Sequence, residues 1–257
     1  MHHAASRPGG LGVVFAAPFA EEMNKSRHVV AQTARRLALA GHSVLSIDLK
    51  GCGDSSGTLD EATWDDWRQD IGLAVDWMRA RGPSRVVLWG FRLGAMLAAQ
   101  AAVERPEAVV RCLLWQPVSL GETHLAQFLR LRVANAMFSG QKSNETGKSL
   151  RARLGAGETL EVAGYSLSPK LAQDLEGLDL AATRPPCPVD WVEVAGEAGQ
   201  PLSAATVRVA EGWRRGGTEV HVQSIVAQPF WAATNAAELV QCEALVDTTA
   251  KLAGAWV

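Results

Sequence analysis

Short apolar runs alternate with longer segments of helical spacing along most of this chain. The apolar runs predict buried strands over residues 12–16, 42–48, 85–89, 109–115, 189–194 and 218–226. Between them, apolar positions that recur every three or four residues predict helices over residues 28–40, 63–81, 95–99, 204–213 and 237–253. Apolar strands that alternate with helices are typical of a mostly parallel sheet flanked by helices, so we expect an α/β fold.

This rhythm changes between about residues 119 and 188. There the pattern predicts a helix over 125–137, a polar loop over 141–148, a short hairpin over 160–165 and a short helix over 169–175. The proline-rich stretch 184–188 predicts a stiff linker back to the sheet. We interpret the segment as a helical cap inserted over the carboxyl edge of the sheet. Residues 1–257 then form one domain, with its core in residues 1–118 and 189–257.

Composition narrows the class of protein. The 257 residues are 47% apolar with a net charge of −2, which suits a large core and lacks the basic field that nucleic acid requires. The four cysteines are Cys52, Cys112, Cys187 and Cys242, and none of them forms a Cys-x-x-Cys pair. We therefore expect free thiols, and neither a bound metal nor another cofactor. Residues 1–10 are polar and no apolar run is long enough to span a bilayer, so we expect a cytoplasmic protein without a transmembrane segment.

The most informative stretch is Gly90-Phe91-Arg92-Leu93-Gly94. It lies between an apolar strand and a small-residue helix, which is the layout of the nucleophile elbow of α/β-hydrolases. In those enzymes the middle residue attacks the substrate, and here it is Arg92. A guanidinium stays protonated and cannot attack a carbonyl carbon. The motif therefore predicts an α/β-hydrolase fold with a degenerate elbow.

A glycine-rich loop follows the second predicted strand. Residues 48–57 fit the pattern Asp-x-x-Gly-x-Gly-x-Ser-x-Gly, which many α/β-hydrolases carry after the strand that precedes the elbow strand. Glycines allow the positive φ angles of a tight loop, and serine hydroxyls satisfy its backbone groups. The loop and the elbow together make the fold prediction specific.

Further motifs resemble those of the exosortase A system-associated hydrolase 2 family. They cover nearly the whole chain and lie at residues 15–27, 114–118, 127–132, 163–168 and 228–231. The resemblance implies an α/β-hydrolase fold and an association with a bacterial exosortase and exopolysaccharide system, with a protein of that pathway as a possible partner. The family name follows the fold and does not establish an activity.

The residues required for a Ser-His-Asp triad are missing from the expected places. Arg92 occupies the nucleophile position, and Glu197 is the one carboxylate in the loop after the strand at 189–194. The loop at 227–231, where the histidine belongs, has none, and His221 lies within the preceding strand. Of the other histidines, His28 follows the opening motif and could approach the site, but we expect it on the surface of a helix.

Arg92 suits a different task, which is to bind an anion. Its planar fork of N–H donors matches a carboxylate or phosphate, and the helix N-terminus beside it favours negative charge. Either a ligand or the protein itself supplies the anion, and Glu21 and Glu22 in the loop after the first strand are the internal candidates. The expected ligand pocket comprises Phe19, Glu21, Glu22, Asn24, Lys25, Arg92, Leu93, Gln116 and Trp231.

Two functions follow from these patterns. The first is a non-catalytic or atypical member of the superfamily, a pseudoenzyme that binds a small anionic or acyl ligand around Arg92. The alternative is an active hydrolase of ester or thioester bonds that uses a non-standard nucleophile. The surrogates would be Ser55, Ser56 or Cys52, all in the glycine-rich loop.

Overall fold

The computed structural model describes residues 1–6, 9–138, 145–232 and 241–256, and the chain divides into two compact units. Unit 1 comprises residues 1–47, 71–119 and 180–257, and unit 2 comprises residues 48–70 and 120–179. No helix within the described ranges is long and apolar enough to cross a membrane.

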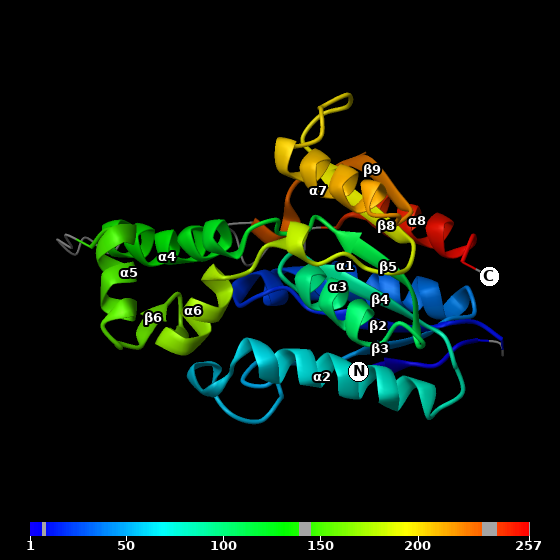
Figure 1. Cartoon of the computed structure of the whole chain (residues 1–257), viewed down its shortest axis with the longest axis horizontal. Coiled ribbons are helices and arrows are strands. Elements are labelled where there is room, and N and C mark those ends of the chain that lie inside the picture. Colours follow the sequence, from blue (N-terminus) through cyan, green and yellow to red (C-terminus); the bar gives the residue numbers. More distant parts are fainter. Residues whose placement is uncertain (7–8, 139–144, 233–240, 257) are drawn as a thin grey trace. The chain divides into compact units, whose positions relative to one another are not determined.

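Unit 1 is built on a seven-stranded sheet with the order β1-β3-β2-β4-β5-β8-β9 (Figure 1). The strands are β1 (His2–His3), β2 (Gly12–Ala16), β3 (Ser43–Ser46), β4 (Val86–Phe91), β5 (Val109–Trp115), β8 (Val189–Ala195) and β9 (Val220–Val226). Strand β1 runs antiparallel to β3, and every other neighbouring pair is parallel. Every residue of β2 and β4 is buried, as expected for strands covered on both faces.

Helices lie on both faces of this sheet, with α3 in front of it and α1 behind it in Figure 1. The helices are α1 (Glu21–Leu39), α2 (Trp64–Arg79), α3 (Gly94–Glu104), α7 (Ala204–Arg215) and α8 (Glu243–Ala253), with a 3-10 turn η3 (Phe230–Ala232). Helix α3 packs on β4 and β5 with small side chains, and α1 packs against α8 and η3. Helix α2 begins in unit 2 and continues into unit 1.

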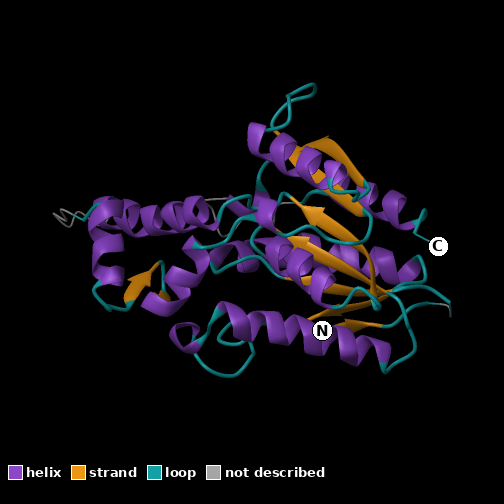
Figure 2. Cartoon of the chain, in the orientation of Figure 1, coloured by secondary structure: helices purple, strands orange, loops and turns teal. Residues whose placement is uncertain are grey.

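Unit 2 is mostly helical, with one hairpin (Figure 2). Its elements are η1 (Leu59–Glu61), α4 (Gly121–Phe138), α5 (Gly147–Gly155), β6 (Leu160–Val162), β7 (Tyr165–Leu167) and α6 (Pro169–Glu176). The hairpin turns at Ala163 and Gly164, both at positive φ, as a two-residue turn between antiparallel strands requires. The carboxylate of Glu145 pairs with both Arg132 and Arg153.

The strand predictions are confirmed, and several helix boundaries were wrong. Helix α1 begins at Glu21 rather than at residue 28, so Glu21 and Glu22 lie in a helix and not in a loop. Its acidic first turn explains the earlier start, because carboxylates stabilise the positive end of the helix dipole. Strand β4 continues through Phe91, and α4 begins at Gly121.

Other differences concern segments with a weak pattern. Residues 147–148 of the predicted polar loop begin α5 after the Thr146 cap, whereas 141–144 lie outside the described residues. The last helix starts at Glu243, and residues 237–240 also lie outside them. The two-residue strand β1 is too short for a periodic signal and was missed. The cap over 119–188 stays a prediction.

Gly94 provides a test of how closely the elbow approaches β2. A Cβ atom there would lie 2.2 Å from the carbonyl oxygen of Ala16 and 2.4 Å from that of Ala17. We expect Gly94→Ala to lower the free energy of unfolding by about 3 kcal/mol, measured by urea denaturation. Gly212 on α7 has nothing within 4 Å, so Gly212→Ala is the control and should raise stability by roughly 0.5–1 kcal/mol. Equal effects of the two substitutions would contradict the close approach.

Candidate functional site

Arg92 lies at the tip of a sharp turn between β4 and α3. Its φ is 53°, in the left-handed region that side chains other than glycine rarely adopt. Its backbone N–H donates to the carbonyl of Trp115 at 3.0 Å, and its own carbonyl accepts from Ala95 at 3.1 Å. The turn therefore has the strand–turn–helix geometry of a nucleophile elbow with an arginine in place of the nucleophile.

The guanidinium of Arg92 forms an ion pair with Glu22 in the first turn of α1. Nε of Arg92 lies 3.0 Å from Oε1 of Glu22, and the two side chains are 14% and 10% exposed. The pairing confirms one of the two internal partners that the sequence offers. Glu21 is half-buried, and burial raises the pKa of its carboxyl, while the charges of Lys25 and Arg92 act in the opposite direction.

The environment of Glu22 is unfavourable for a carboxylate. Its Oε2 atom is buried and has no hydrogen-bond partner in the described part of the chain. Burial raises the pKa of Glu22 to about 7, although the charge and the hydrogen bond of Arg92 act in the opposite direction. Glu21 raises this pKa further and Lys25 lowers it. Glu22 therefore titrates near neutral pH.

An aromatic ring also lies close to the guanidinium. Cζ of Arg92 lies 5.5 Å from the ring centroid of Trp231, within the range of a cation–π contact. Phe230 stacks on Phe91 with centroids 5.4 Å apart, and Trp231 contacts both rings edge to face. The cation of the elbow thus contacts Trp231, which packs on the buried rings of Phe91 and Phe230.

Gln116 and Glu193 extend the polar network around Arg92. Glu193 was not among the residues that we predicted from the sequence. Gln116 leaves β5 at a φ of 40°, and its carbonyl accepts a long hydrogen bond of 3.5 Å from Nη1 of Arg92. Its side chain donates to Glu193 at 3.0 Å and accepts from the N–H of Val194 at 2.6 Å. The buried Glu193 also accepts from Trp191 and Thr206. The sequence did contain a signal for Glu193, because it is a carboxylate within the mostly apolar strand β8.

The other residues of the expected pocket have different environments. Phe19 and Leu93 are buried, and the carbonyl of Phe19 accepts from the N–H of Glu22 at 3.2 Å. Lys25 is half-buried and close enough to Glu22 to affect its pKa, while Asn24 is exposed on α1. Direct contacts with the guanidinium come from Glu22, Gln116 and Trp231.

Within the part of the chain that the structure describes, the residues at the triad positions do not form a Ser-His-Asp triad. Glu197 is exposed in the loop after β8. His221 is exposed on β9 and pairs with Glu219 at 2.6 Å. His221 is in register with Asp190 on β8. Asp190 lies two residues before Val192, which is in register with Trp115 at the end of β5, so His221 lies below the elbow. His28 lies nearly two turns further along α1 than Glu22.

The surrogate nucleophiles all lie in unit 2. Cys52 is half-buried, and burial raises the pKa of its thiol to about 11, with the charges of Asp48 and Asp70 adding to the effect. A thiol with this pKa is protonated at neutral pH and is a poor nucleophile. Ser55 and Ser56 close the glycine-rich loop through their backbone: the N–H of Ser55 donates to the carbonyl of Cys52 at 3.0 Å, and the carbonyl of Ser56 accepts from the N–H of Gly51 at 3.0 Å.

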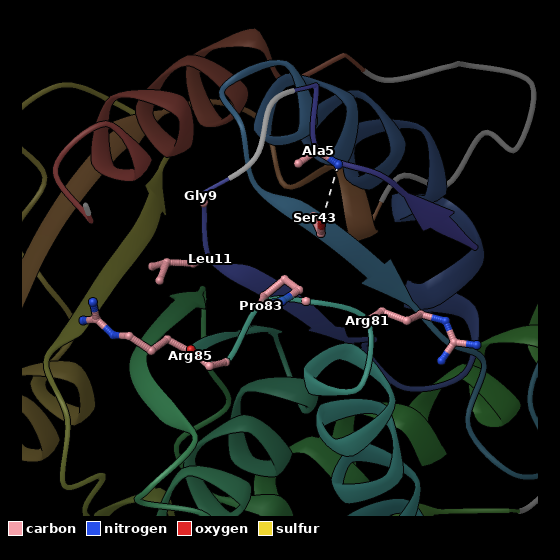
Figure 3. Close-up of a pocket in the computed structure, with 10 residues that line it drawn as sticks. Ala5, Gly9, Leu11, Ser43, Arg81, Pro83 and Arg85 are labelled. Carbon is pink, nitrogen blue, oxygen red and sulfur yellow. Dashed lines mark hydrogen bonds between the residues drawn. The ribbon is translucent and has the colours of Figure 1, made fainter.

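A separate hollow of about 480 Å³ lies at the opposite, amino-terminal edge of the sheet (Figure 3). Leu11, Ser43 and Arg85 line it where β2, β3 and β4 begin, and the N–H of Ala5 donates to Ser43 Oγ at 3.3 Å. The side chains of Arg81 and Arg85 extend outward in opposite directions. Ligands of open α/β sheets bind at the carboxyl ends of the strands, so Arg92 and not this hollow marks the candidate site. No group of three or more potential metal ligands converges among the described residues.

The parallel strand order and the elbow define this chain as an α/β-hydrolase-fold protein. A family model described as Hydrolase_4, serine aminopeptidase, S33, matches residues 13–153, more than half of the chain. The chain belongs to this family.

Curated relatives match over a shorter stretch. Palmitoyl-protein thioesterase ABHD10, mitochondrial, of Bos taurus is 32% identical over 99 residues, which are 38% of this chain and 31% of the relative. Uncharacterized protein RP471 of Rickettsia prowazekii (strain Madrid E) is 35% identical over 89 residues, 34% of this chain and 36% of that protein. The match thus spans about a third of the length of these relatives.

Solved structures match over nearly the whole chain. Est1E from Butyrivibrio proteoclasticus with bound ferulic acid has a TM-score of 0.68 at 14% identity, covering 98% of this chain and 92% of that one. Alpha/beta hydrolase domain-containing protein 10 from mouse has a TM-score of 0.57 at 18% identity, with the same coverage. At these identities the likeness establishes the fold.

The raised pKa of Glu22 predicts a pH-dependent contribution to stability. Between pH 4.5 and about 7 the folded state binds a proton at Glu22 that the unfolded state has lost, so stability falls as the pH rises through this window. Glu22→Gln cannot ionise and lacks this loss. We expect the difference in free energy of unfolding between Glu22→Gln and the wild type to shift in favour of the variant by on the order of 3 kcal/mol as the pH rises from 4.5 to 8, measured by urea denaturation.

Glu197→Gln is the matched control, because Glu197 is exposed in a loop. Its stability difference from the wild type should stay constant over the same pH range. A constant difference for Glu22→Gln as well would show that Glu22 ionises normally in the folded protein.

Proposed function

We propose that this chain is a member of the family that lacks serine-type hydrolysis and binds a small anionic or acyl ligand at Arg92. The observation that carries the proposal is the position of Arg92 at the tip of the elbow, paired with the buried carboxylate of Glu22. A guanidinium provides charge and hydrogen bonds but no attacking electron pair. The retained turn therefore positions a binding group where relatives would position a nucleophile.

The donor count of Arg92 supports a ligand as well as Glu22. Of its five N–H donors, two make hydrogen bonds within the described part of the chain, to Glu22 and to the carbonyl of Gln116. A carboxylate can accept from the remaining donors in a bidentate manner. The ring of Trp231, whose centroid lies 5.5 Å from Cζ of Arg92, is backed by the buried rings of Phe91 and Phe230 and offers an aromatic contact to the rest of an acyl or aryl acid.

The alternative, an active ester or thioester hydrolase, has support from the relatives. The names of ABHD10 and Est1E describe a thioesterase and a ferulic acid complex, respectively. Such an activity in this chain would need Ser55, Ser56 or Cys52 as the nucleophile, since Arg92 cannot serve. The raised pKa of Cys52 and the absence of a histidine from the loop at 227–231 argue against this route.

The biological setting belongs to the same proposal. The resemblance of the opening motif at 15–27 to exosortase-associated hydrolases suggests a role in an exopolysaccharide pathway, with a protein of that pathway as a partner.

Ferulate tests the binding site, because it combines a carboxylate with an aromatic ring. We expect the wild-type protein to bind ferulate at least about tenfold more tightly than it binds methyl ferulate, measured by calorimetry. We expect Arg92→Met to bind ferulate at least about tenfold more weakly than the wild-type protein does. Binding should tighten from pH 8 to pH 6, because protonation of Glu22 removes the competing anion from Arg92. Arg208→Met, at an exposed position on α7, is the control for net charge.

Removing Arg92 alone leaves the Glu22 carboxylate buried, so the double variant Arg92→Met/Glu22→Leu is the matched form that preserves packing. Equal affinity of the double variant and the wild type for ferulate would contradict the proposed site.

Restoring a serine tests the missing triad. We expect Arg92→Ser to show neither turnover of p-nitrophenyl butyrate nor labelling by a fluorophosphonate, because no base is positioned to activate the serine. Arg92→Ser/Glu22→Gln removes the unpaired carboxylate and checks that misfolding is not the cause. Labelling of wild-type protein that Ser55→Ala or Ser56→Ala abolishes would favour the hydrolase alternative.

A further inference from the structure

Two of the four cysteines lie against each other inside unit 1. Sγ of Cys112 and Sγ of Cys187 are 3.9 Å apart, although 75 positions separate them in the sequence. Cys112 is fully buried in β5, and Cys187 keeps 7% of its surface exposed. A pair of buried thiols in contact is a chemical group that neither the elbow nor the fold comparison explains.

The backbone holds this pair in place from both sides. The N–H of Cys112 donates to the carbonyl of Pro188 at 3.0 Å, and Cys112 is in register with Val189 at the start of β8. Cys187 lies in a bend between Pro186 and Pro188, whose rings restrict the backbone. The two thiols are therefore fixed as neighbours by the sheet and by the proline-rich linker.

The two thiols differ in acidity. A hydrogen bond from Cys112 lowers the pKa of Cys187, and the nearby Arg111 acts in the same direction. The hydrogen bond and burial raise the pKa of Cys112. Cys187 is thus the more acidic and the more accessible thiol, which suits it to react first with a small oxidant.

We propose that Cys112 and Cys187 form a modification site, a thiol pair that a hydroperoxide oxidises reversibly to a disulfide within unit 1. The Cys187 thiolate attacks the terminal oxygen of the hydroperoxide, breaks the O–O bond and becomes a sulfenic acid, while an alcohol or water leaves. The Cys112 thiol then attacks that sulfur, the S–S bond forms and water leaves. Two thiols and one hydroperoxide give one disulfide, one alcohol or water, and one further water.

The geometry permits this bond. The sulfurs must approach from 3.9 Å to about 2 Å, and a change of χ1 rotamer at either cysteine moves its sulfur over a comparable distance. The bond would join β5 to the linker that returns from unit 2, and so close a loop that contains residues 120–179 of that unit. A closed loop of this length restricts the unfolded chain and stabilises the fold.

The experiment uses wild-type protein, reduced and then treated with stoichiometric hydrogen peroxide. We expect an intact mass lower by two hydrogens, a peptide map that links Cys112 to Cys187, and unmodified thiols at Cys52 and Cys242. The melting temperature should rise by roughly 5–10 °C, and dithiothreitol should reverse both changes. The matched control is Cys52→Ser/Cys242→Ser, which keeps the pair and should behave like the wild type.

A second variant tests the order of the two steps. In Cys112→Ser, peroxide should produce a sulfenic acid at Cys187 that dimedone traps, and no disulfide within the chain. If this variant does not fold, the peptide map of the wild type decides the question. A map in which Cys112 and Cys187 remain unlinked, or are linked to another cysteine or to a second chain, would overturn the proposal.

Discussion

The candidate site depends on one constraint: a cation buried at the elbow must have an acceptor. The side chain of Arg92 is 14% exposed, and an unpaired guanidinium at that depth would be strongly destabilising. Glu22 satisfies it at 3.0 Å and ties the first turn of α1 to the turn between β4 and α3. In α/β-hydrolases the turn between strand and helix carries the nucleophile, and the loop that leads into the helix corresponding to α1 contributes to the oxyanion hole. Here the same two segments are joined by an ion pair.

The backbone around the ion pair resembles that of a hydrolase active site, whereas the side chains differ from those of such a site. Ala20, Arg92 and Gln116 all have positive φ, at 50°, 53° and 40°, and they follow the ends of the adjacent strands β2, β4 and β5. Such strained conformations persist where the surrounding structure enforces them, and they cluster at functional sites. The fold therefore retains the sharp turns that display reactive groups, while Arg92 changes what is displayed.

Much of this arrangement could be predicted from particular residues. The elbow glycines, the loop at 48–57 and the apolar strands identified the fold, and the family match over residues 13–153 and the structural neighbours agree with it. The chemistry of Arg92 and the two candidate partners followed from charge alone. Glu193 and its bonds with Gln116 were missed, because contacts between β5 and β8 join residues that lie far apart in the sequence.

The sequence by itself determined the order of strands and helices and the presence of an arginine at the elbow position, because periodic burial and side-chain chemistry are local properties. It left Glu21 and Glu22 as equal partners for Arg92 and treated four cysteines as isolated thiols. The tertiary structure decided both points. Helix α1 begins early enough to bury Glu22 against the guanidinium, and the pairing of β5 with β8 brings Cys112 to Cys187. Which side chains meet depends on how distant segments pack, and no local pattern encodes that.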